Sequence, residues 1–233
     1  MGSTQINLKD TMSNTREQKE VYFSKRIETL VDPHRHMNCC VSYETIMRFV
    51  KFHNFDAAPG KHLDIGCGDR VLCKVFDENG WSSAGVDIAD GIDFEIDKLP
   101  HENQSIDMIT LYGVIEHITN PDMLLKEIHR ILSIKGVCVM ITPNIVSEGM
   151  TFYDDPDHKK PYSPTGFSWL MKMYGFNICR IGLWTVKKPS FIWGLPLGAQ
   201  FFIGKLFPFY GRNKYVPQFL KGRSKTMIGI MSR

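Results

Sequence analysis

Residues 62–69, HLDIGCGD, form the segment best suited to ligand chemistry, because a short strand-like run ends in two closely spaced glycines. Gly66 and Gly68 predict a tight turn between a strand and a helix that starts near Val71. Glycines at this place let the backbone approach a ligand and expose amide groups at a helix start. Many turns use two glycines for structural reasons alone, so the hypothesis of a binding site needs other residues.

Two acidic residues lie where strands are expected to end. Asp64 precedes Gly66 by two residues, and a buried carboxylate there requires a cationic or hydrogen-bond-donating partner. Asp87 follows Gly66 by 21 residues, where doubly wound sheets place an acid that accepts hydrogen bonds from both ribose hydroxyls. The third glycine of the dinucleotide fingerprint is missing, because position 71 is Val. This favours a ligand without a pyrophosphate over a nicotinamide cofactor.

A sheet is needed to position these residues. Apolar segments at residues 62–65, 84–88, 106–111 and 136–142 predict strands, and the stretches between them predict helices. This alternation is typical of a mostly parallel sheet with helices on both faces. The helix after residue 119 is expected to start at Asn120, Pro121 and Asp122. Its apolar stripe consists of Met123, Leu124, Ile128, Ile131 and Leu132.

The two ends of the chain are expected to add further elements. Three-to-four spacing predicts two helices before residue 50, the first through Val21, Ile27 and Leu30 and the second through Tyr43, Ile46, Met47 and Val50. Asp32 and Pro33 separate the two helices. Towards the other end, we expect a helix over residues 168–174, which Gly175 ends, and strands over residues 176–183 and 225–231.

Composition indicates a globular chain. With 233 residues, 43% apolar residues and a net charge of +3, the chain fits one packed domain and excludes wholesale disorder, a collagen-like repeat and a disulfide mini-protein. None of the six cysteines has a partner at CxxC spacing, which favours free thiols in a reducing compartment. Without a secretory or myristoylation signal in the first residues, we expect a cytoplasmic protein.

Several motifs in one order resemble those of the class I S-adenosylmethionine-dependent methyltransferases, over roughly residues 62–231. Residues 63–68 look like the first motif of that family, and residues 86–88 look like the second. Further matches lie at residues 99–100, 105–107, 114–118, 120–121 and 141–144, which resemble the small-molecule branch of the family. The resemblance implies a Rossmann-like, seven-stranded, mostly parallel sheet in a single α/β domain, with a short third strand near Phe94.

The resemblance also implies roles for individual residues. S-adenosylmethionine is the expected cofactor, with the glycine turn and Asp64 at its amino-acid end, Asp87 at the ribose and Ile88 against the adenine. The acid near the adenine is expected to be Glu95, then Asp93, with Asp97 as the remaining alternative. The full expected cofactor set is Asp64, Gly66, Cys67, Gly68, Asp87, Ile88, Asp93, Glu95, Leu111 and Tyr112.

His117 and His158 are the candidate bases for the acceptor. A structural hydrogen bond is at least as good an interpretation for His117, whereas His158 lies in a polar loop after the fifth strand of the family pattern, where such enzymes often shape the acceptor pocket. Some relatives bind a metal through Glu, a second Glu three residues on and the adjacent His, but the first of these positions is Gly113 here. We therefore expect no metal, and we expect His34 and His36 to be surface residues.

The chain is expected to divide into an N-terminal helical cap (residues 1–55), a cofactor-binding core (56–185) and a basic, aromatic insertion or lid with the final strand (186–233). This last part holds nine Lys or Arg, no acidic residue and nine aromatic residues. One interpretation is an aromatic layer packed on the sheet with a solvated basic rim. The other is a lid that binds a lipid-linked or phosphate-bearing acceptor and contacts an anionic membrane peripherally.

The activity that the resemblance implies is methyl transfer from S-adenosylmethionine to a small-molecule, lipid-linked or glycan-linked acceptor, and O-methylation is the expected reaction. Two alternatives stay open. One is RNA methylation, in which the basic tail would follow a phosphate backbone. The other is a protein that binds the cofactor without catalysis, because a fold alone does not determine function.

Overall fold

The computed structural model describes residues 33–55, 58–184, 190–206 and 225–233. Within them lies one six-stranded sheet in the order β2-β1-β3-β4-β6-β5. The first four of these strands are parallel, and β6 is antiparallel to both of its neighbours. The strands are β1 (Lys61–Ile65), β2 (Ser82–Val86), β3 (Ile106–Tyr112), β4 (Leu132–Pro143), β5 (Ile178–Leu183) and β6 (Thr226–Ser232). The mostly parallel α/β sheet is confirmed.

The expectation of a short strand near Phe94 is wrong, because these residues form turns. The described sheet therefore has six strands rather than seven. The carboxylate of Asp97 accepts the backbone N–H of Asp93, and the carboxylate of Asp93 accepts the backbone N–H of Glu95. Acidic side chains that bind nearby N–H groups favour turns, because they satisfy donors that a strand would use in its ladder. The segment therefore turns, and β2 ends the described sheet.

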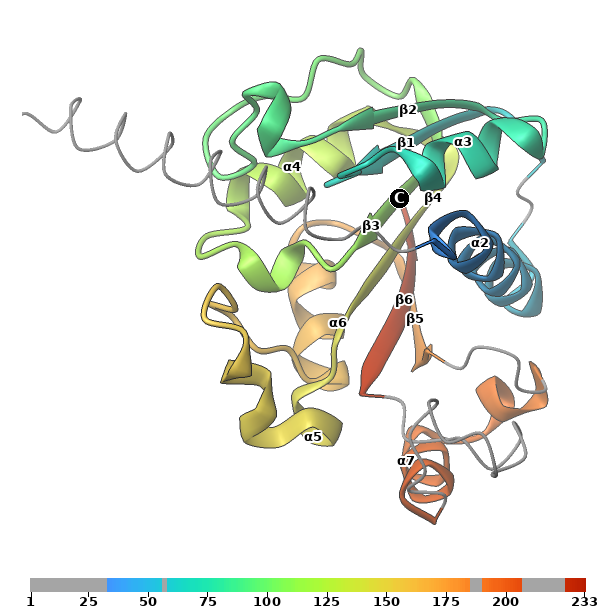
Figure 1. The fold of residues 1–233 in the computed structure, drawn as a ribbon, viewed down its shortest axis with the longest axis vertical. Coiled ribbons are helices and arrows are strands. Elements are labelled where there is room, and N and C mark those ends of the chain that lie inside the picture. Colours follow the sequence, from blue (N-terminus) through green and yellow to red (C-terminus); the bar gives the residue numbers. More distant parts are fainter. Residues whose placement is uncertain (1–32, 56–57, 185–189, 207–224) are drawn as a thin grey trace, which may run out of the picture.

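Helices cover both faces of the sheet (Figure 1). Strand residues and helices α4 and α6 share one buried apolar cluster, and α2 and α3 share the other with the opposite face. The α-helices are α2 (Arg35–Phe52), α3 (Val71–Glu78), α4 (Asp122–Ile131), α5 (Ile145–Glu148), α6 (Pro164–Met173) and α7 (Leu197–Leu206). Short 3₁₀ helices are η1 (Ile88–Asp90), η2 (Ile115–His117), η3 (Gly149–Asp154) and η4 (Ser190–Gly194). No described helix is both long and apolar enough to cross a membrane.

Most of the expected helices form close to their predicted positions. The second N-terminal helix corresponds to α2, whereas the first lies outside the described residues. Helix α6 begins at Pro164, four residues before the predicted start, because the Ser163 side chain accepts the N–H of Gly166 and Pro164 needs no N–H partner at the first turn. Gly175 follows its end in the left-handed conformation, with φ +85°.

Part of the basic, aromatic segment packs on the core. The Trp193 indole is buried, donates to the backbone oxygen of Leu183 at 3.0 Å and contacts Phe49 of α2 edge to face. Phe191 and Phe202, in contrast, are 66% and 62% exposed. The predicted aromatic contacts with the core therefore form for one part of the segment, whereas residues 207–224, which include Phe207, Phe209 and Tyr210, lie outside the described residues.

Candidate active site

A cleft lies at the carboxyl ends of β1, β2 and β3, where parallel α/β sheets bind their ligands. It consists of two adjoining cavities of about 410 and 400 Å³, which share Arg35, Gly66, Cys67 and Tyr112. The larger cavity is also lined by Gly68, Asp87, Ile88, Asp93, Phe94, Glu95, Gly113, Val114, Glu116, His117, Ile118, His158 and Lys159. The smaller cavity is also lined by Asn38, Cys39, Val41, Ser42, Asp64, Leu72 and Trp184. Each volume suits part of a nucleoside-sized ligand.

The glycine turn forms the shared floor of the two cavities. Gly66 and Gly68 have φ values of +75° and +51°, which side chains with a Cβ rarely adopt. A Cβ on Gly66 would lie only 2.3 Å from Cγ2 of Val114, across the cleft floor. This position therefore requires glycine for its backbone conformation and for the space beside it.

The carboxylate of Asp87 is held by the backbone. Its Oδ2 accepts the N–H of Gly68 at 2.9 Å, and its Oδ1 accepts the N–H of Ala89 at 3.1 Å. The side chain of Asp90 in turn accepts the N–H of Asp87, which completes a capping box at the start of η1. The carboxylate is thus fixed at the edge of the larger cavity before any ligand binds.

Thr110 supplies the hydrogen-bond donor that was expected for the buried carboxylate of Asp64. The Thr110 hydroxyl donates to Oδ1 of Asp64 at 2.6 Å. Since that proton is used, the Thr110 oxygen accepts the Nε2–H of His62 at 2.9 Å, and Ser83 donates to the other ring nitrogen at 2.7 Å. Burial lowers the pKa of His62 to about 3, so this ring stays neutral and brings no charge to Asp64.

Asp64 itself is nearly fully buried at the wall of the smaller cavity. Burial raises the pKa of its carboxyl to about 7, an effect that the hydrogen bond from Thr110 and the positive charge of Arg35 only partly oppose. A carboxylate that is so costly to ionise suits a cationic ligand group, which would lower the cost.

Arg35 is a site residue that the sequence analysis missed. It lies at the start of α2, and its guanidinium makes a two-point contact with the carboxylate of Asp69 at 2.7 and 3.1 Å. The same side chain lines both cavities and places a positive charge at the junction between them. No motif marks it, because it comes from a helix outside the glycine-turn segment and is brought to the cleft only by the packing of α2 against α3.

The candidates for the adenine acid differ in placement. Asp93 and Glu95 both line the larger cavity, whereas Asp97 does not. The Glu95 carboxylate accepts the backbone N–H of Thr119 at 3.4 Å and that of Asn120 at 3.1 Å, so it also fixes the loop before α4. The cleft therefore contains both of the acids that were ranked first and second.

Tyr112 and Leu111 lie at the end of β3, and both were expected to contact the cofactor, but only Tyr112 lines the cleft. Tyr112 lines both cavities and contacts Trp184 edge to face. Leu111 is buried in the core and does not line the cleft. The expectation for Leu111 is corrected on physical grounds, because successive side chains of a strand point to opposite faces.

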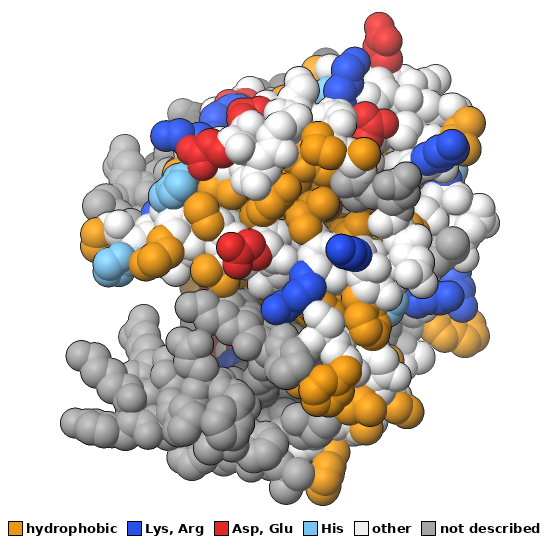
Figure 2. Space-filling model, turned by 90° about the vertical axis from the view of Figure 1, so that its right-hand side faces the viewer, with side chains coloured by type: hydrophobic (Ala, Val, Ile, Leu, Met, Phe, Trp, Pro, Cys, Tyr) orange, Lys and Arg blue, Asp and Glu red, His pale blue; other side chains and the backbone are white. Residues whose placement is uncertain are grey.

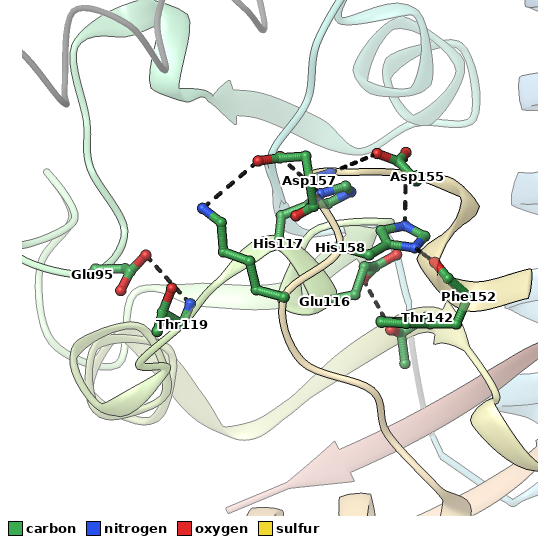
Figure 3. Close-up of polar contacts among 10 residues, drawn as sticks. Glu95, Glu116, His117, Thr119, Thr142, Phe152, Asp155, Asp157 and His158 are labelled. Carbon is green, nitrogen blue, oxygen red and sulfur yellow. Dashed lines mark hydrogen bonds and ion pairs between the residues drawn. The ribbon is translucent and has the colours of Figure 1, made fainter. Parts of the chain in front are cut away.

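In the larger cavity, Glu116, His117 and His158 come together (Figure 3). The first two follow β3, whereas His158 follows η3, and the backbone oxygen of Glu116 holds the two segments together by accepting the N–H groups of Lys159 and Lys160 at 2.9 and 3.0 Å. Burial raises the pKa of the Glu116 carboxyl to about 7. Both predicted histidines therefore face the cleft, beside a buried acid that was not among the predicted site residues.

His34 and His36 lie elsewhere, on the exposed surface of the cap, as expected. Nε2 of His36 lies 3.0 Å from the carboxylate of Glu78 on α3. Neither ring lines the cleft.

Comparisons with known proteins agree with this geometry. Residues 32–181 match the family model of a methyltransferase domain, and no curated protein matches the sequence. The fold is similar to a SAM-dependent methyltransferase from Archaeoglobus fulgidus, with 17% identity, a TM-score of 0.52 and coverage of 83% of this chain and 94% of that one. It is also similar to an S-adenosylmethionine-dependent methyltransferase from Mesorhizobium loti, with 15% identity, a TM-score of 0.54 and coverage of 78% and 96%.

A third similar structure is phosphoethanolamine N-methyltransferase 2 from Haemonchus contortus, solved with phosphomonomethylethanolamine and S-adenosylhomocysteine. It shares 17% identity and a TM-score of 0.52 over 82% of this chain and 52% of that one. At these identities the likeness of the three structures lies in the fold.

Proposed function

This chain belongs to the family of methyltransferase domains, since the family model covers residues 32–181, and from that premise we propose O-methylation of a small-molecule, lipid-linked or glycan-linked acceptor. The chain is an S-adenosylmethionine-dependent methyltransferase of Rossmann-like fold. The observation that supports the use of the cofactor is the pair of preorganised acids, Asp64 and Asp87, on either side of the glycine turn. The observation that supports methyl transfer to an acceptor oxygen is the pair of histidines, His117 and His158, that line the same cavity.

The residues of the cleft fit the cofactor. The bare backbone at Gly66 leaves room that a Cβ would fill, and the buried carboxylate of Asp64 suits the cationic amino-acid end. When bound, the cofactor supplies a methyl group already activated by a positively charged sulfur. Asp87 would hold the ribose hydroxyls, and Ile88 with Glu95 or Asp93 would hold the adenine. Cys67 and Tyr112, which line both cavities, would lie between the amino-acid and nucleoside ends.

The contribution of the protein to the rate is then positioning and the exclusion of water. Alignment of two reacting groups accounts for a large part of many enzymatic rate enhancements. Tyr112 and the buried Trp184 form a wall where the two cavities meet, beside the α2 helix. We propose that this wall directs the methyl group towards the end of the larger cavity that holds His117 and His158.

His117 and His158 are accordingly our candidates for the residues that activate the acceptor oxygen. Both rings line the larger cavity, and their centroids are 4.8 Å apart. Lys159 lines the same cavity, and its positive charge suits an acceptor that carries a phosphate or another anionic group.

Replacing Asp87 with Ala is expected to weaken cofactor binding by about 1 to 3 kcal/mol, because charge-assisted hydrogen bonds to the ribose are lost. Isothermal titration calorimetry with S-adenosylhomocysteine measures this change. The matched control is Asp122→Ala, which removes an exposed carboxylate on α4 outside the cleft and should leave the affinity unchanged. An unchanged affinity in the Asp87 variant would contradict the proposed ribose contact.

The lid and membrane hypothesis is retained as a proposal for the basic, aromatic segment. In the described part of that segment, Phe191 and Phe202 expose most of their side chains. Figure 2 shows one face of the molecule on which hydrophobic side chains lie beside Lys and Arg side chains. Aromatic rings favour the membrane interface, and each basic residue near an anionic surface contributes about 1 kcal/mol.

The protein is therefore expected to float with phosphatidylserine vesicles more than with neutral vesicles, and a double variant Phe191→Ser, Phe202→Ser is expected to float less. Point substitutions suit this test better than deletion of the segment, because Trp193 packs against α2. Trp169→Ser is the control, because Trp169 is a 69% exposed aromatic residue on α6. Equal flotation on both vesicle types would exclude the membrane version of the hypothesis.

A further inference from the structure

Two cysteine side chains lie next to each other beneath the floor of the cleft. Cys67 belongs to the glycine turn, and Cys73 lies in the first turn of α3. A Cβ on Gly85 of β2 would lie 2.6 Å from Sγ of Cys67 and 3.0 Å from Sγ of Cys73. The sum of these two distances, about 5.6 Å, is the largest separation that the two sulfur atoms can have. Because Gly85 has no side chain, it leaves the space that this pair of sulfurs occupies.

The two thiols are also hydrogen-bonded to each other. This hydrogen bond lowers the pKa of the Cys73 thiol, and Ser83 and the positive charge of Arg70 act in the same direction, although burial opposes them. The same hydrogen bond, together with burial, raises the pKa of Cys67. Since the thiolate is the reactive form of cysteine, Cys73 is the stronger nucleophile of the pair, and Cys67 is the proton donor beside it.

The pair is buried, but the cleft gives access to it. Cys67 and Cys73 are 4% and 6% exposed, and Cys67 lines both cavities. A small oxidant can therefore reach the sulfurs through the cleft while the protein stays folded. Cys39 lines the smaller cavity only, and burial raises its pKa to about 11, which makes it a poorer nucleophile.

We propose that a peroxide converts Cys67 and Cys73 into a reversible disulfide and that this bond weakens cofactor binding. One sulfur attacks a peroxide oxygen, the O–O bond breaks, and a sulfenic acid and one water form. The other sulfur then attacks the sulfenic sulfur, the S–O bond breaks, and a second water leaves. Each thiol proton ends in one of the two waters. The pair of sulfurs therefore gives up two electrons, which reduce the peroxide.

The effect on the cofactor rests on the proposed function, whereas formation of the disulfide does not. Disulfide sulfurs are about 2.05 Å apart, so the bond draws the Cys67 side chain towards α3. The residues on either side of Cys67 are tied to the end of β2. The N–H of Gly66 donates to the backbone oxygen of Val86 at 2.8 Å, and the N–H of Gly68 donates to Asp87 at 2.9 Å. A shift of Cys67 disturbs these contacts and the carboxylate that is proposed to hold the ribose.

The test treats the reduced protein with hydrogen peroxide, blocks the remaining free thiols and identifies linked peptides by mass spectrometry after digestion with trypsin. Trypsin cleaves after Arg70, so the two cysteines end in separate peptides, residues 62–70 and 71–74. We expect these two peptides to be joined, and dithiothreitol to separate them. Saturation with S-adenosylhomocysteine should slow the reaction, because the ligand would cover Cys67.

The linked protein is expected to bind S-adenosylhomocysteine at least about 10-fold more weakly than the reduced protein in calorimetry, because hydrogen bonds of the turn are disturbed. Cys73→Ser removes the partner of Cys67 without changing a residue that lines the cleft. This variant should form no link and keep its affinity after the same treatment. Cys179→Ser, on β5 outside the cleft, is the matched control and should become linked and lose affinity like the wild type.

The disulfide is refuted if peptides 62–70 and 71–74 stay unlinked, or if Cys67 is joined to Cys39 instead. This result comes from the wild type, so it does not depend on whether a variant folds. Undiminished affinity in the linked protein, or an equal loss of affinity in peroxide-treated Cys73→Ser, would overturn the effect on the cofactor. If the reduced protein bound no S-adenosylhomocysteine, the proposed function would fail, and the masses of the peptides would still decide whether the disulfide forms.

Discussion

Replacing Gly66 with Ala is expected to reduce the affinity for S-adenosylhomocysteine about 100-fold, which corresponds to about 2.7 kcal/mol. Two costs combine. The new Cβ would lie 2.3 Å from Cγ2 of Val114, and overpacking of this kind costs about 1 to 3 kcal/mol. The φ of +75° adds about 1 to 2 kcal/mol of strain for a residue with a Cβ. Calorimetry gives the affinity, and thermal unfolding gives the loss of stability.

The control for backbone strain alone is Gly80→Ala. Gly80 has a similar φ of +87°, but a Cβ there meets only the Pro59 side chain, at an ordinary contact distance of 3.8 Å, and the residue does not line the cleft. This variant should lose some stability and keep its cofactor affinity. The double variant Gly66→Ala, Val114→Ala should regain stability, because the clash is relieved, but not affinity, because the new methyl group still occupies the turn. Full affinity in Gly66→Ala would show that the turn does not approach the cofactor.

The sequence predicted those parts of the fold that depend on local patterns. The glycine turn, both acids at strand ends and the part of the α4 stripe formed by Leu124, Ile128 and Ile131 are set by residues close together in the chain, so their spacing suffices. The two other residues of the predicted stripe differ, since Leu132 begins β4 and Met123 is only partly buried. The start of α6 has a local signal too, because Ser163 caps the helix and Pro164 occupies its first turn. No strand forms near Phe94, because the side chains of Asp97 and Asp93 accept nearby backbone N–H groups. The spacing of apolar residues does not reveal whether such hydrogen bonds form.

The parts of the site that escaped prediction depend on tertiary contacts. Arg35 reaches the cleft through the packing of α2 on α3. Glu116, which was not predicted as a site residue, meets the predicted His158 because its backbone oxygen accepts the N–H groups of Lys159 and Lys160. Neither contact leaves a pattern in a single sequence. The hydrogen bonds from His62 to Thr110 and from Thr110 to Asp64 could not be predicted for the same reason. These residues lie on two adjacent strands and meet only when the register of the sheet is set.

The burial of Asp64 lowers the stability of the protein without its cofactor. Its pKa is raised from 3.8 to about 7, so the folded protein retains a proton that the unfolded chain releases. The stability of the protein therefore falls as the pH rises from about 4 to about 7, and the full cost is present above pH 7. A bound cationic group requires the ionised form, so cofactor affinity should change in the opposite direction and rise as the pH increases through 7.

Asp64→Asn is accordingly expected to raise the unfolding temperature of the cofactor-free protein at pH 8 and to lower the cofactor affinity about 100-fold. The amide keeps an oxygen that accepts from Thr110, so the relay to His62 persists while the buried charge disappears. Loss of one partner from a buried charge pair costs about 2 to 5 kcal/mol of binding. Thermal unfolding at pH 4, 6 and 8 and calorimetry at pH 6 and 8 measure the two effects.

The stability gain should vanish near pH 4, and the affinity of the variant should lose the pH dependence that Asp64 confers. Glu116, the other buried acid of the cleft, is present in both proteins, so the comparison isolates the contribution of Asp64 from that of Glu116. The control Asp122→Asn removes an exposed carboxylate whose pKa is lowered by its hydrogen bond with Lys126, so it should not stabilise the protein at pH 8. A less stable Asp64→Asn protein with unchanged affinity would mean that this carboxylate serves the fold rather than the ligand.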